Sequence, residues 1–206
     1  MADELRCACR SLSKAYGRRT AVHDCTLDIR GGESVGLVGE NGSGKSTLIR
    51  CLLGFTAPTS GTTWVCPSVG YCPQENYLNR RLTVREHFRL LAELYRLRGD
   101  VDDSFLQDMI ERMNLPPYLP LQVGELSSGT YQKVKFVTSI FHRPNLLVLD
   151  EPTDGFDWRM YQTFWEIMTE VKEWKGALLM VSHLLYERDK FDRILEMKDG
   201  HCDQTR

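Results

Sequence analysis

Hydrophobic residues along the chain follow a pattern that changes twice. Up to about residue 71, short segments of β-forming residues are separated by turns; 26–29 alternates between polar and apolar residues, and 62–65 is rich in β-formers. From about 83 to 144, apolar residues recur at helical spacing instead. We therefore expect an α/β protein in which a helical lobe interrupts a core that contains strands.

Three helices are predicted in the middle of the chain. Thr83 and Glu86 have the spacing of a capping box, and apolar residues at helical spacing follow them. Prolines at positions 116, 117 and 144 are expected to stop helices. The predicted helices run from Thr83 up to Gly99, from about Ser104 to Met113, and from Ser127 towards His142.

The strand-containing core resumes after Pro144. The apolar run 146–150 is typical of a central parallel strand, because such a strand is buried on both faces. A helical stripe of apolar residues at 160, 164, 167, 171 and 174 predicts a helix packed on the core. The run 177–181 predicts another buried strand, and 194–197 a closing strand before a turn at 198–200.

A glycine-rich stretch, G-E-N-G-S-G-K-S-T, joins the apolar run 34–38 to the run 48–53. Glycines let a loop turn tightly and aim its N–H groups at phosphate oxygens, while a lysine and a hydroxyl at this spacing reach the terminal phosphates and Mg²⁺. The helix expected behind the loop favours the same negative charge. The stretch therefore predicts nucleoside triphosphate binding. Its candidate ligand-binding residues are Gly39, Asn41, Gly42, Ser43, Gly44, Lys45, Ser46 and Thr47.

Two consecutive carboxylates, Asp150 and Glu151, end the apolar run 146–150. An aspartate at the end of a strand next to a phosphate loop can hold Mg²⁺ or its water shell. A glutamate one residue further along can orient or deprotonate an attacking water. We expect these roles for Asp150 and Glu151.

Composition narrows the class of protein without naming a substrate. The 206 residues carry a formal net charge of −2, which gives no electrostatic reason to expect nucleic-acid binding. Apolar runs are too short to span a bilayer, and the acidic start does not resemble a signal peptide, so we expect a cytoplasmic location. Seven cysteines, an odd number without a C-x-x-C pair, predict reduced thiols.

Taken in order, the motifs resemble the nucleotide-binding domain of ATP-binding cassette (ABC) proteins, from about Leu5 to Gly200. They are Tyr16 in 14–17, the loop 39–47, Gln74 in 71–74, Leu126-Ser-Ser-Gly-Thr130, the strand 146–150 with 151–152, the loop 153–157, and His183. The resemblance implies one domain over 1–206. Its phosphate-loop NTPase core would have a parallel sheet, an N-terminal antiparallel β subdomain, and an inserted α-helical subdomain at about 75–144.

The resemblance also implies roles for residues that spacing alone leaves open. Tyr16 would stack on the adenine of ATP, and His183 would contact the γ-phosphate. Gln74 would contact Mg²⁺ and water beside Ser46 and Asp150. Ser127 and Gly129 would face the phosphate held by a second cassette, so that two chains close around two ATP molecules.

Three residues depart from the common family pattern. The segment 126–130 corresponds to the signature motif of the family, and in it Ser128 stands in place of a glycine and Thr130 in place of a glutamine. Trp158 stands where a proline is frequent. The differences at Ser128 and Thr130 leave open how this signature affects hydrolysis. The difference at Trp158 leaves open the details of the contact between subunits.

The family resemblance favours an ATPase subunit of a membrane transporter, most similar to the ABC-2 group of drug, peptide or antibiotic exporters. A separate permease would then hold the chain at the cytoplasmic face of the membrane. One alternative is a regulatory or scaffold subunit with little hydrolysis. A GTPase or small-molecule kinase is a second alternative, against which the sequence offers no N-K-x-D motif for guanine.

Overall fold

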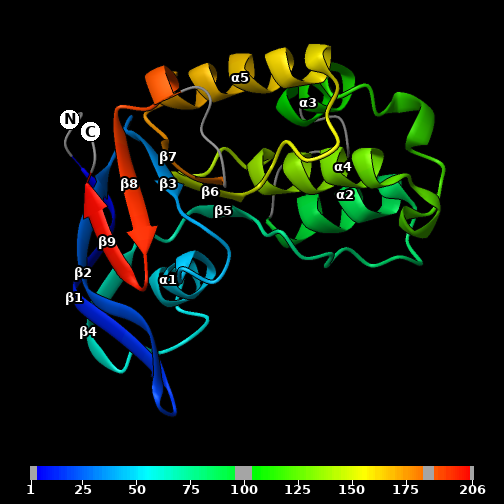
Figure 1. The fold of residues 1–206 in the computed structure, drawn as a ribbon. Coiled ribbons are helices and arrows are strands. Elements are labelled where there is room, and N and C mark those ends of the chain that lie inside the picture. The colour runs from blue at the N-terminus through cyan, green and yellow to red at the C-terminus, as the bar shows by residue number, and fades with distance from the viewer. Residues whose placement is uncertain (1–3, 96–103, 183–187, 205–206) are drawn as a thin grey trace. The chain divides into compact units, whose positions relative to one another are not determined.

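The computed structural model describes residues 4–95, 104–182 and 188–204 (Figure 1). The chain divides into two compact units. The first contains the residues up to Val69, Asn145–Glu151 and the residues from Glu170 onward. The second contains Gly70–Pro144 and Pro152–Thr169.

An antiparallel sheet in the first unit consists of β1 (Leu5–Tyr16), β2 (Arg19–Arg30) and β4 (Ser60–Val65), in the order β2-β1-β4. Gly17, with a φ of 61°, forms the tight turn that pairs the end of β1 with the start of β2. The two strands are 12 residues each, so the prediction of only short strands here is wrong. Register shifts along β1 and β2 interrupt the alternation of apolar residues, which makes each strand look shorter in sequence.

The second sheet supplies the parallel strands of this unit. It contains β3 (Ser34–Val38), β6 (Leu146–Asp150), β7 (Ala177–Ser182), β8 (Arg193–Lys198) and β9 (His201–Gln204). Their order is β6-β7-β3-β8-β9; the first four are parallel, and β9 is antiparallel to β8.

Burial explains why three of these strands are continuous apolar runs. Every residue of β3 and of β6 is buried, as are the first five residues of β7. The predicted strands at 146–150, 177–181 and 194–197 are confirmed. Because β3, β6 and β7 are parallel, the segments that follow their carboxyl ends lie at one edge of the sheet.

Helix α1 (Lys45–Leu52) follows β3 after the loop 39–44 and packs on the antiparallel strands β1, β2 and β4. Its residues Leu48, Ile49 and Leu52 are buried. Figure 1 shows α1 beside the blue and cyan strands of this sheet. Strand β5 (Val69–Cys72) begins at the last residue of this unit, and the short helix η3 (Arg188–Lys190) precedes β8.

The second unit is helical. It contains α2 (Val84–Leu94), α3 (Ser104–Arg112), α4 (Ser128–Ile140) and most of α5 (Trp158–Glu173), with short helices η1 (Pro116–Tyr118) and η2 (Val123–Glu125). The predicted helices are confirmed, although α2 ends at Leu94, and residues 96–99 of its predicted range lie outside the described residues. The predicted lobe at 75–144 lies inside this unit; that it is inserted in a single domain stays a prediction.

Local chemistry fixes the start of α2, and packing fixes α4. The Thr83 hydroxyl accepts a hydrogen bond from the Glu86 N–H at 3.2 Å, and the Glu86 carboxylate accepts one from the Thr83 N–H at 2.8 Å, which completes the predicted capping box. Helix α4 is buried nearly all round, and the ring centroids of its Phe136 and of Phe164 on α5 lie 5.3 Å apart.

Within the described residues, no helix is long and apolar enough to cross a membrane.

Asp192 directly precedes β8 and connects it with β3 and with the end of α5 in the first unit. Its carboxylate accepts hydrogen bonds from the Ser34 N–H at 2.8 Å and the Ser34 hydroxyl at 2.7 Å, at the start of β3. Lys172 of α5 forms an ion pair with the same carboxylate at 2.8 Å. Partial burial raises the pKa of Asp192, but the hydrogen bonds from Lys172 and Ser34 outweigh it, so the pKa lies below its ordinary value.

We predict that Asp192→Asn lowers the free energy of unfolding by about 1 kcal/mol at pH 7, a modest value because the carboxylate is half exposed. A carboxylate with a depressed folded-state pKa stabilises above its unfolded pKa, and this contribution is lost as pH falls through the folded pKa. The difference from wild type should therefore shrink in acid. Urea unfolding at several pH values measures it, with the exposed Asp189→Asn as control. A difference independent of pH would contradict the assignment.

Candidate functional site

The loop 39–44 adopts backbone conformations that require glycine. Gly39, Gly42 and Gly44 have φ values of 154°, 81° and 113°. A Cβ on Gly39 would lie 2.2 Å from the Met197 carbonyl oxygen, and one on Gly44 would lie 2.2 Å from that of Ala21. The loop is therefore packed against the backbone of β2 and of β8, with no space for a side chain at either point.

Lys45 is the first residue of α1, and its side chain extends back to this loop. Its Nζ donates hydrogen bonds to the carbonyl oxygens of Gly39 at 2.6 Å and Glu40 at 2.9 Å, and the residue is 6% exposed. Burial lowers the pKa of Lys45, while the charges of Glu151 and Asp150 act in the opposite direction. The ammonium group is thus held among carbonyl oxygens near two carboxylates from the end of β6.

The loop also presents hydrogen-bond donors suited to an anion. The Ser43 hydroxyl oxygen is buried and has no hydrogen-bond partner among the described residues. Gly44 caps α1 without a side-chain hydrogen bond, so no side chain at the cap satisfies the first N–H groups of the helix. These donors, together with the Lys45 ammonium, match the acceptor oxygens and negative charge of phosphate groups.

Asp150 and Glu151 come from the carboxyl end of β6. Asp150 is 5% exposed and ends the strand, and Glu151 is partly buried. Glu151 has a φ of 51°, which is uncommon for a residue with a side chain, and its N–H donates to the Val181 carbonyl oxygen at 3.0 Å. That bond to β7 fixes the backbone at the point where the chain leaves the sheet.

Tyr16 ends β1 and is 52% exposed. The Lys14 Nζ lies 4.9 Å from the centroid of its ring. The aromatic side chain is thus accessible for stacking on a flat ligand, and its predicted contact with adenine stays a prediction.

In the second unit, Ser127 caps helix α4. Its hydroxyl accepts a hydrogen bond from the Thr130 N–H at 3.3 Å and shares another with the Thr130 hydroxyl at 2.9 Å. A Cβ on Gly129 would lie 2.9 Å from the Gly155 carbonyl oxygen. The loop around Gly155 therefore requires glycine at position 129.

Ser128 and Gly155 line a cavity of about 320 Å³ in the same unit. Its other lining residues include Arg80, Tyr131 and Asp154. The serine that departs from the family pattern thus faces a hollow at the start of α4.

Gln74 is held by a residue that the sequence did not single out. The Lys135 Nζ on α4 donates to the Gln74 carbonyl oxygen at 3.0 Å, and Lys135 is only 1% exposed. Nearby, the Tyr131 hydroxyl accepts a hydrogen bond from the Leu78 N–H at 2.9 Å. A charged residue on the apolar face of a predicted helix was the available signal for Lys135.

The predicted site residues divide between the two units. Tyr16, the loop residues, Asp150 and Glu151 lie in the first unit, and within it the structure brings Lys45 close to both carboxylates. Gln74, Ser127 and Gly129 lie in the second. His183 lies outside the described residues.

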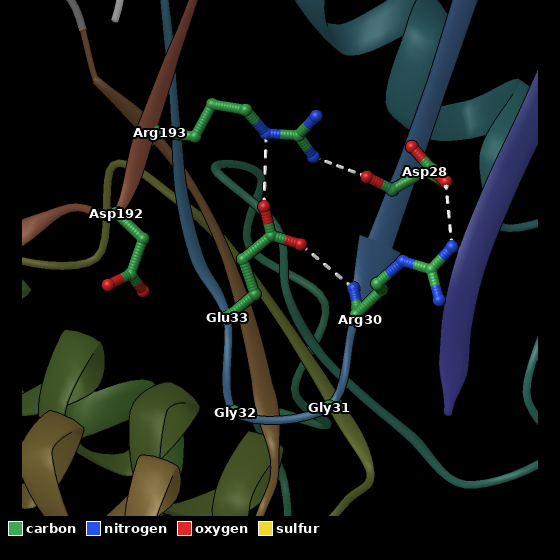
Figure 2. Close-up of a pocket in the computed structure, with 7 residues that line it drawn as sticks. All are labelled: Asp28, Arg30, Gly31, Gly32, Glu33, Asp192 and Arg193. Atoms are coloured by element: carbon green, nitrogen blue, oxygen red, sulfur yellow. Dashed lines mark hydrogen bonds and ion pairs between the residues drawn. The ribbon is translucent and has the colours of Figure 1, made fainter. Parts of the chain in front are cut away.

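A separate cavity of about 330 Å³ at the turn from β2 to β3 is lined mostly by charged residues (Figure 2). Figure 2 shows Glu33 between Arg193, whose Nε lies 3.0 Å from its carboxylate, and the Arg30 N–H, which donates to it at 2.9 Å. Asp28 forms an ion pair with Arg30 at 3.6 Å, and its carbonyl oxygen accepts from Arg193. These charges satisfy one another, which indicates a structural network.

Comparison with known proteins supports a single family. The family described as ABC transporter matches residues 22–154. The mouse ABC-type organic anion transporter ABCA8A is 34% identical over 193 residues, which cover 89% of this chain but only 12% of the mouse protein. An ABC transporter ATP-binding protein of Methanocaldococcus jannaschii, MJ1023, is 29% identical over 92% of this chain and 73% of its own length. The Nod factor export ATP-binding protein I of Burkholderia lata is also 29% identical, over 93% of this chain and 67% of its own length.

Solved structures agree on the fold. An ATP-binding subunit of an ABC transporter superposes with a TM-score of 0.90 at 27% identity, over 97% of this chain and 90% of that chain. The cassette MJ0796, described as a dimer in a post-hydrolysis state with ADP and Pi, superposes with a TM-score of 0.85 at 21% identity, over 97% of this chain and 99% of that chain. With its phosphate loop, parallel core and helical unit, the chain belongs to the ABC transporter family, in which it is an ATP-binding cassette.

Proposed function

We propose that this ABC ATPase cassette hydrolyses ATP at a site shared with a second cassette and thereby drives a membrane permease of the exporter type. One observation carries the proposal: the buried Lys45 lies within the glycine loop and close to the carboxylates Asp150 and Glu151. A cation held for phosphate beside a potential base is the arrangement that phosphoryl transfer to water needs.

The loop residues Gly39, Asn41, Gly42, Ser43, Gly44, Lys45, Ser46 and Thr47 would bind the phosphates of ATP. Backbone N–H groups at the start of α1 and the Lys45 ammonium would neutralise the phosphate charge, and the exposed ring of Tyr16 would take the adenine.

Ser46 and Asp150 in the first unit would supply oxygen ligands of the kind that a magnesium ion prefers, and Gln74, the third predicted ligand, belongs to the second unit. When bound, Mg²⁺ neutralises charge on the phosphate oxygens. Asp150 suits this role because it ends β6, at the same edge of the sheet as the loop that follows β3.

Glu151 would orient the attacking water and accept its proton. Its backbone is fixed by the bond to Val181, so the carboxylate leaves the sheet in a defined direction. His183 would contact the γ-phosphate. These residues would thus lower the activation barrier of ATP hydrolysis, because the attacking water and the groups that contact the γ-phosphate are in position before the reaction begins.

A second cassette would complete each site. Ser127 and Gly129 at the start of α4 would meet the γ-phosphate bound by the other copy, because a helix N-terminus favours an anion. The fold neighbour MJ0796 is described as a dimer, which supports this arrangement.

Relatives support the exporter type, whereas the substrate class of drug, peptide or antibiotic is proposed from the resemblance to the ABC-2 group. These relatives include an organic anion transporter and Nod factor export proteins. The chain spans about an eighth of the first of these, and we propose a transmembrane permease as its partner. Such a permease would hold the cassette at the cytoplasmic face of the membrane, carry a drug, peptide or antibiotic substrate, and contact the segment that follows Gln74.

A regulatory subunit with little hydrolysis is the second candidate function. The Ser127 hydroxyl, which would face the phosphate, is engaged with the Thr130 hydroxyl, and Ser128 adds a side chain where the family has glycine. Trp158, where the family frequently has proline, is 72% exposed. Its ring stacks on that of Tyr161, with centroids 6.0 Å apart, and gives the start of α5 an aromatic surface.

Glu151→Gln should reduce ATP turnover at least about 100-fold, because the amide cannot accept the proton of water. Turnover is measured on the cassette alone and in complex with its permease in vesicles, and wild-type turnover should rise in the complex. Glu196→Gln on the exposed face of β8 is the control and should retain wild-type turnover. ATP binding without turnover in either wild-type preparation would favour the regulatory subunit instead.

ATP should convert Glu151→Gln protein from monomer to dimer in analytical ultracentrifugation, because trapped ATP joins the two cassettes. Adding Ser127→Asp should abolish the dimer: aspartate retains the helix cap but opposes the phosphate with a negative charge. Adding Gln162→Glu, an exposed change on α5, should leave the dimer intact. Equal dimerisation of the two double variants would argue against a phosphate contact by Ser127.

A further inference from the structure

Three cysteines from distant parts of the sequence meet in the first unit. Cys9 lies on β1, Cys25 on β2 and Cys202 on β9. The Sγ atoms of Cys9 and Cys25 are 4.0 Å apart. Strand β9 packs against β2, and the Cys202 side chain there is near enough to shift the pKa of Cys25. Cys25 therefore lies between two other thiols.

Neighbouring contacts hold β9 beside β2 at this point. The His23 N–H donates to the Gly200 carbonyl oxygen at 2.8 Å. The rings of His23 and His201 are stacked, with centroids 4.7 Å apart and planes 9° from parallel. The pairing of Cys25 with Cys202 is thus part of an ordered contact between two strands.

The three thiols differ in exposure and acidity. Cys9 and Cys25 are 1% and 2% exposed, whereas Cys202 is partly exposed. Interaction with the Cys25 side chain lowers the pKa of Cys202, and the same interaction raises the pKa of Cys25. Cys25 lowers the pKa of Cys9 as well, but Cys9 is buried, so Cys202 is the thiol of the three that combines partial exposure with a lowered pKa. The thiolate is the form that reacts with oxidants.

A metal site explains the cluster less well. Among the described residues, no group of histidine, cysteine or acidic side chains has an arrangement that could hold a metal ion. A reactive thiol beside a buried second thiol matches a sensor cysteine with its resolving partner.

We propose that Cys202 and Cys25 form a peroxide-sensitive pair whose disulfide displaces the phosphate loop and weakens nucleotide binding. In the first step, the Cys202 thiolate attacks one oxygen of hydrogen peroxide; the O–O bond breaks, giving Cys202 sulfenic acid and hydroxide. In the second step, the Cys25 sulfur attacks the sulfenic sulfur and an S–S bond forms. The Cys25 proton and the sulfenic hydroxyl leave together as water.

The strands that carry this pair also support the phosphate loop. The Gly200 N–H donates to the Ser43 carbonyl oxygen at 3.0 Å, and Gly44 packs against the backbone of Ala21 on β2. Disulfide formation brings two sulfurs to about 2.05 Å, much closer than a hydrogen bond between thiols. A movement of β9 towards β2 would displace Gly200 and, through its hydrogen bond, Ser43. Because Gly44 has no free space against Ala21, the loop would have to shift.

The test uses the full chain, first reduced and then treated with hydrogen peroxide. Free thiols are blocked with N-ethylmaleimide, and peptide mass spectrometry identifies the disulfides. We expect a Cys25–Cys202 linkage. Titration with a fluorescent ATP analogue should then show about tenfold weaker affinity, within the usual range of coupling between two sites, and dithiothreitol should restore it. The affinity readout rests on the proposed ATP site, whereas the linkage readout does not.

Matched variants make the result specific. Cys202→Ser should abolish both the linkage and the loss of affinity. Cys25→Ala should leave Cys202 as a sulfenic acid that dimedone traps. Cys66→Ser, a buried cysteine outside the cluster whose thiol bonds to the Ser68 carbonyl oxygen, should behave as wild type. Thermal unfolding of each reduced variant verifies that it is folded.

Three results would overturn the inference: a Cys9–Cys25 linkage after peroxide, no linkage after peroxide, or a Cys25–Cys202 linkage with unchanged affinity for the ATP analogue. A reduced wild-type protein that binds no ATP would instead refute the proposed function, and the linkage result would still decide the thiol pair.

Discussion

Close packing of the phosphate loop on neighbouring backbone is the constraint on which the rest of the site depends. At Gly39 and Gly44 the loop lies so near the carbonyl groups of Met197 and Ala21 that a single Cβ would collide with them. The loop is thereby fixed between β2 and the hairpin of β8 and β9. A loop fixed in this way holds its N–H groups in place before any phosphate arrives, which reduces the ordering that binding requires.

The same packing sets the electrostatics around Lys45. Two loop carbonyl oxygens hold its ammonium group, burial disfavours its charge, and Asp150 and Glu151 favour it. Phosphate would add strong negative charge to this balance, which explains why a buried lysine can be retained here. The parallel order of β3, β6 and β7 is what brings the lysine and the carboxylates to one edge of the sheet.

Local patterns predicted much of this arrangement. The buried strands 146–150 and 177–181, the capping box at Thr83 and the ABC fold itself could be predicted because each depends on a short segment or on motif order. The full length of β1 and the strand β9 could not, since bulges and edge pairing obscure alternation. The contact of Lys135 with Gln74 and the cysteine cluster depend on the tertiary fold. The roles of the individual site residues stay predictions.

Equilibrium binding of ATP to wild type and to Lys45→Met tests the central claim most directly. Removing a charge-assisted bond to phosphate should weaken affinity by about 10- to 100-fold, while Lys190→Met, an exposed change in η3, should leave it unchanged. Thermal unfolding of the ligand-free proteins would verify that each is folded. Equal affinity of the folded Lys45→Met and wild-type proteins for ATP would contradict the account of the phosphate loop.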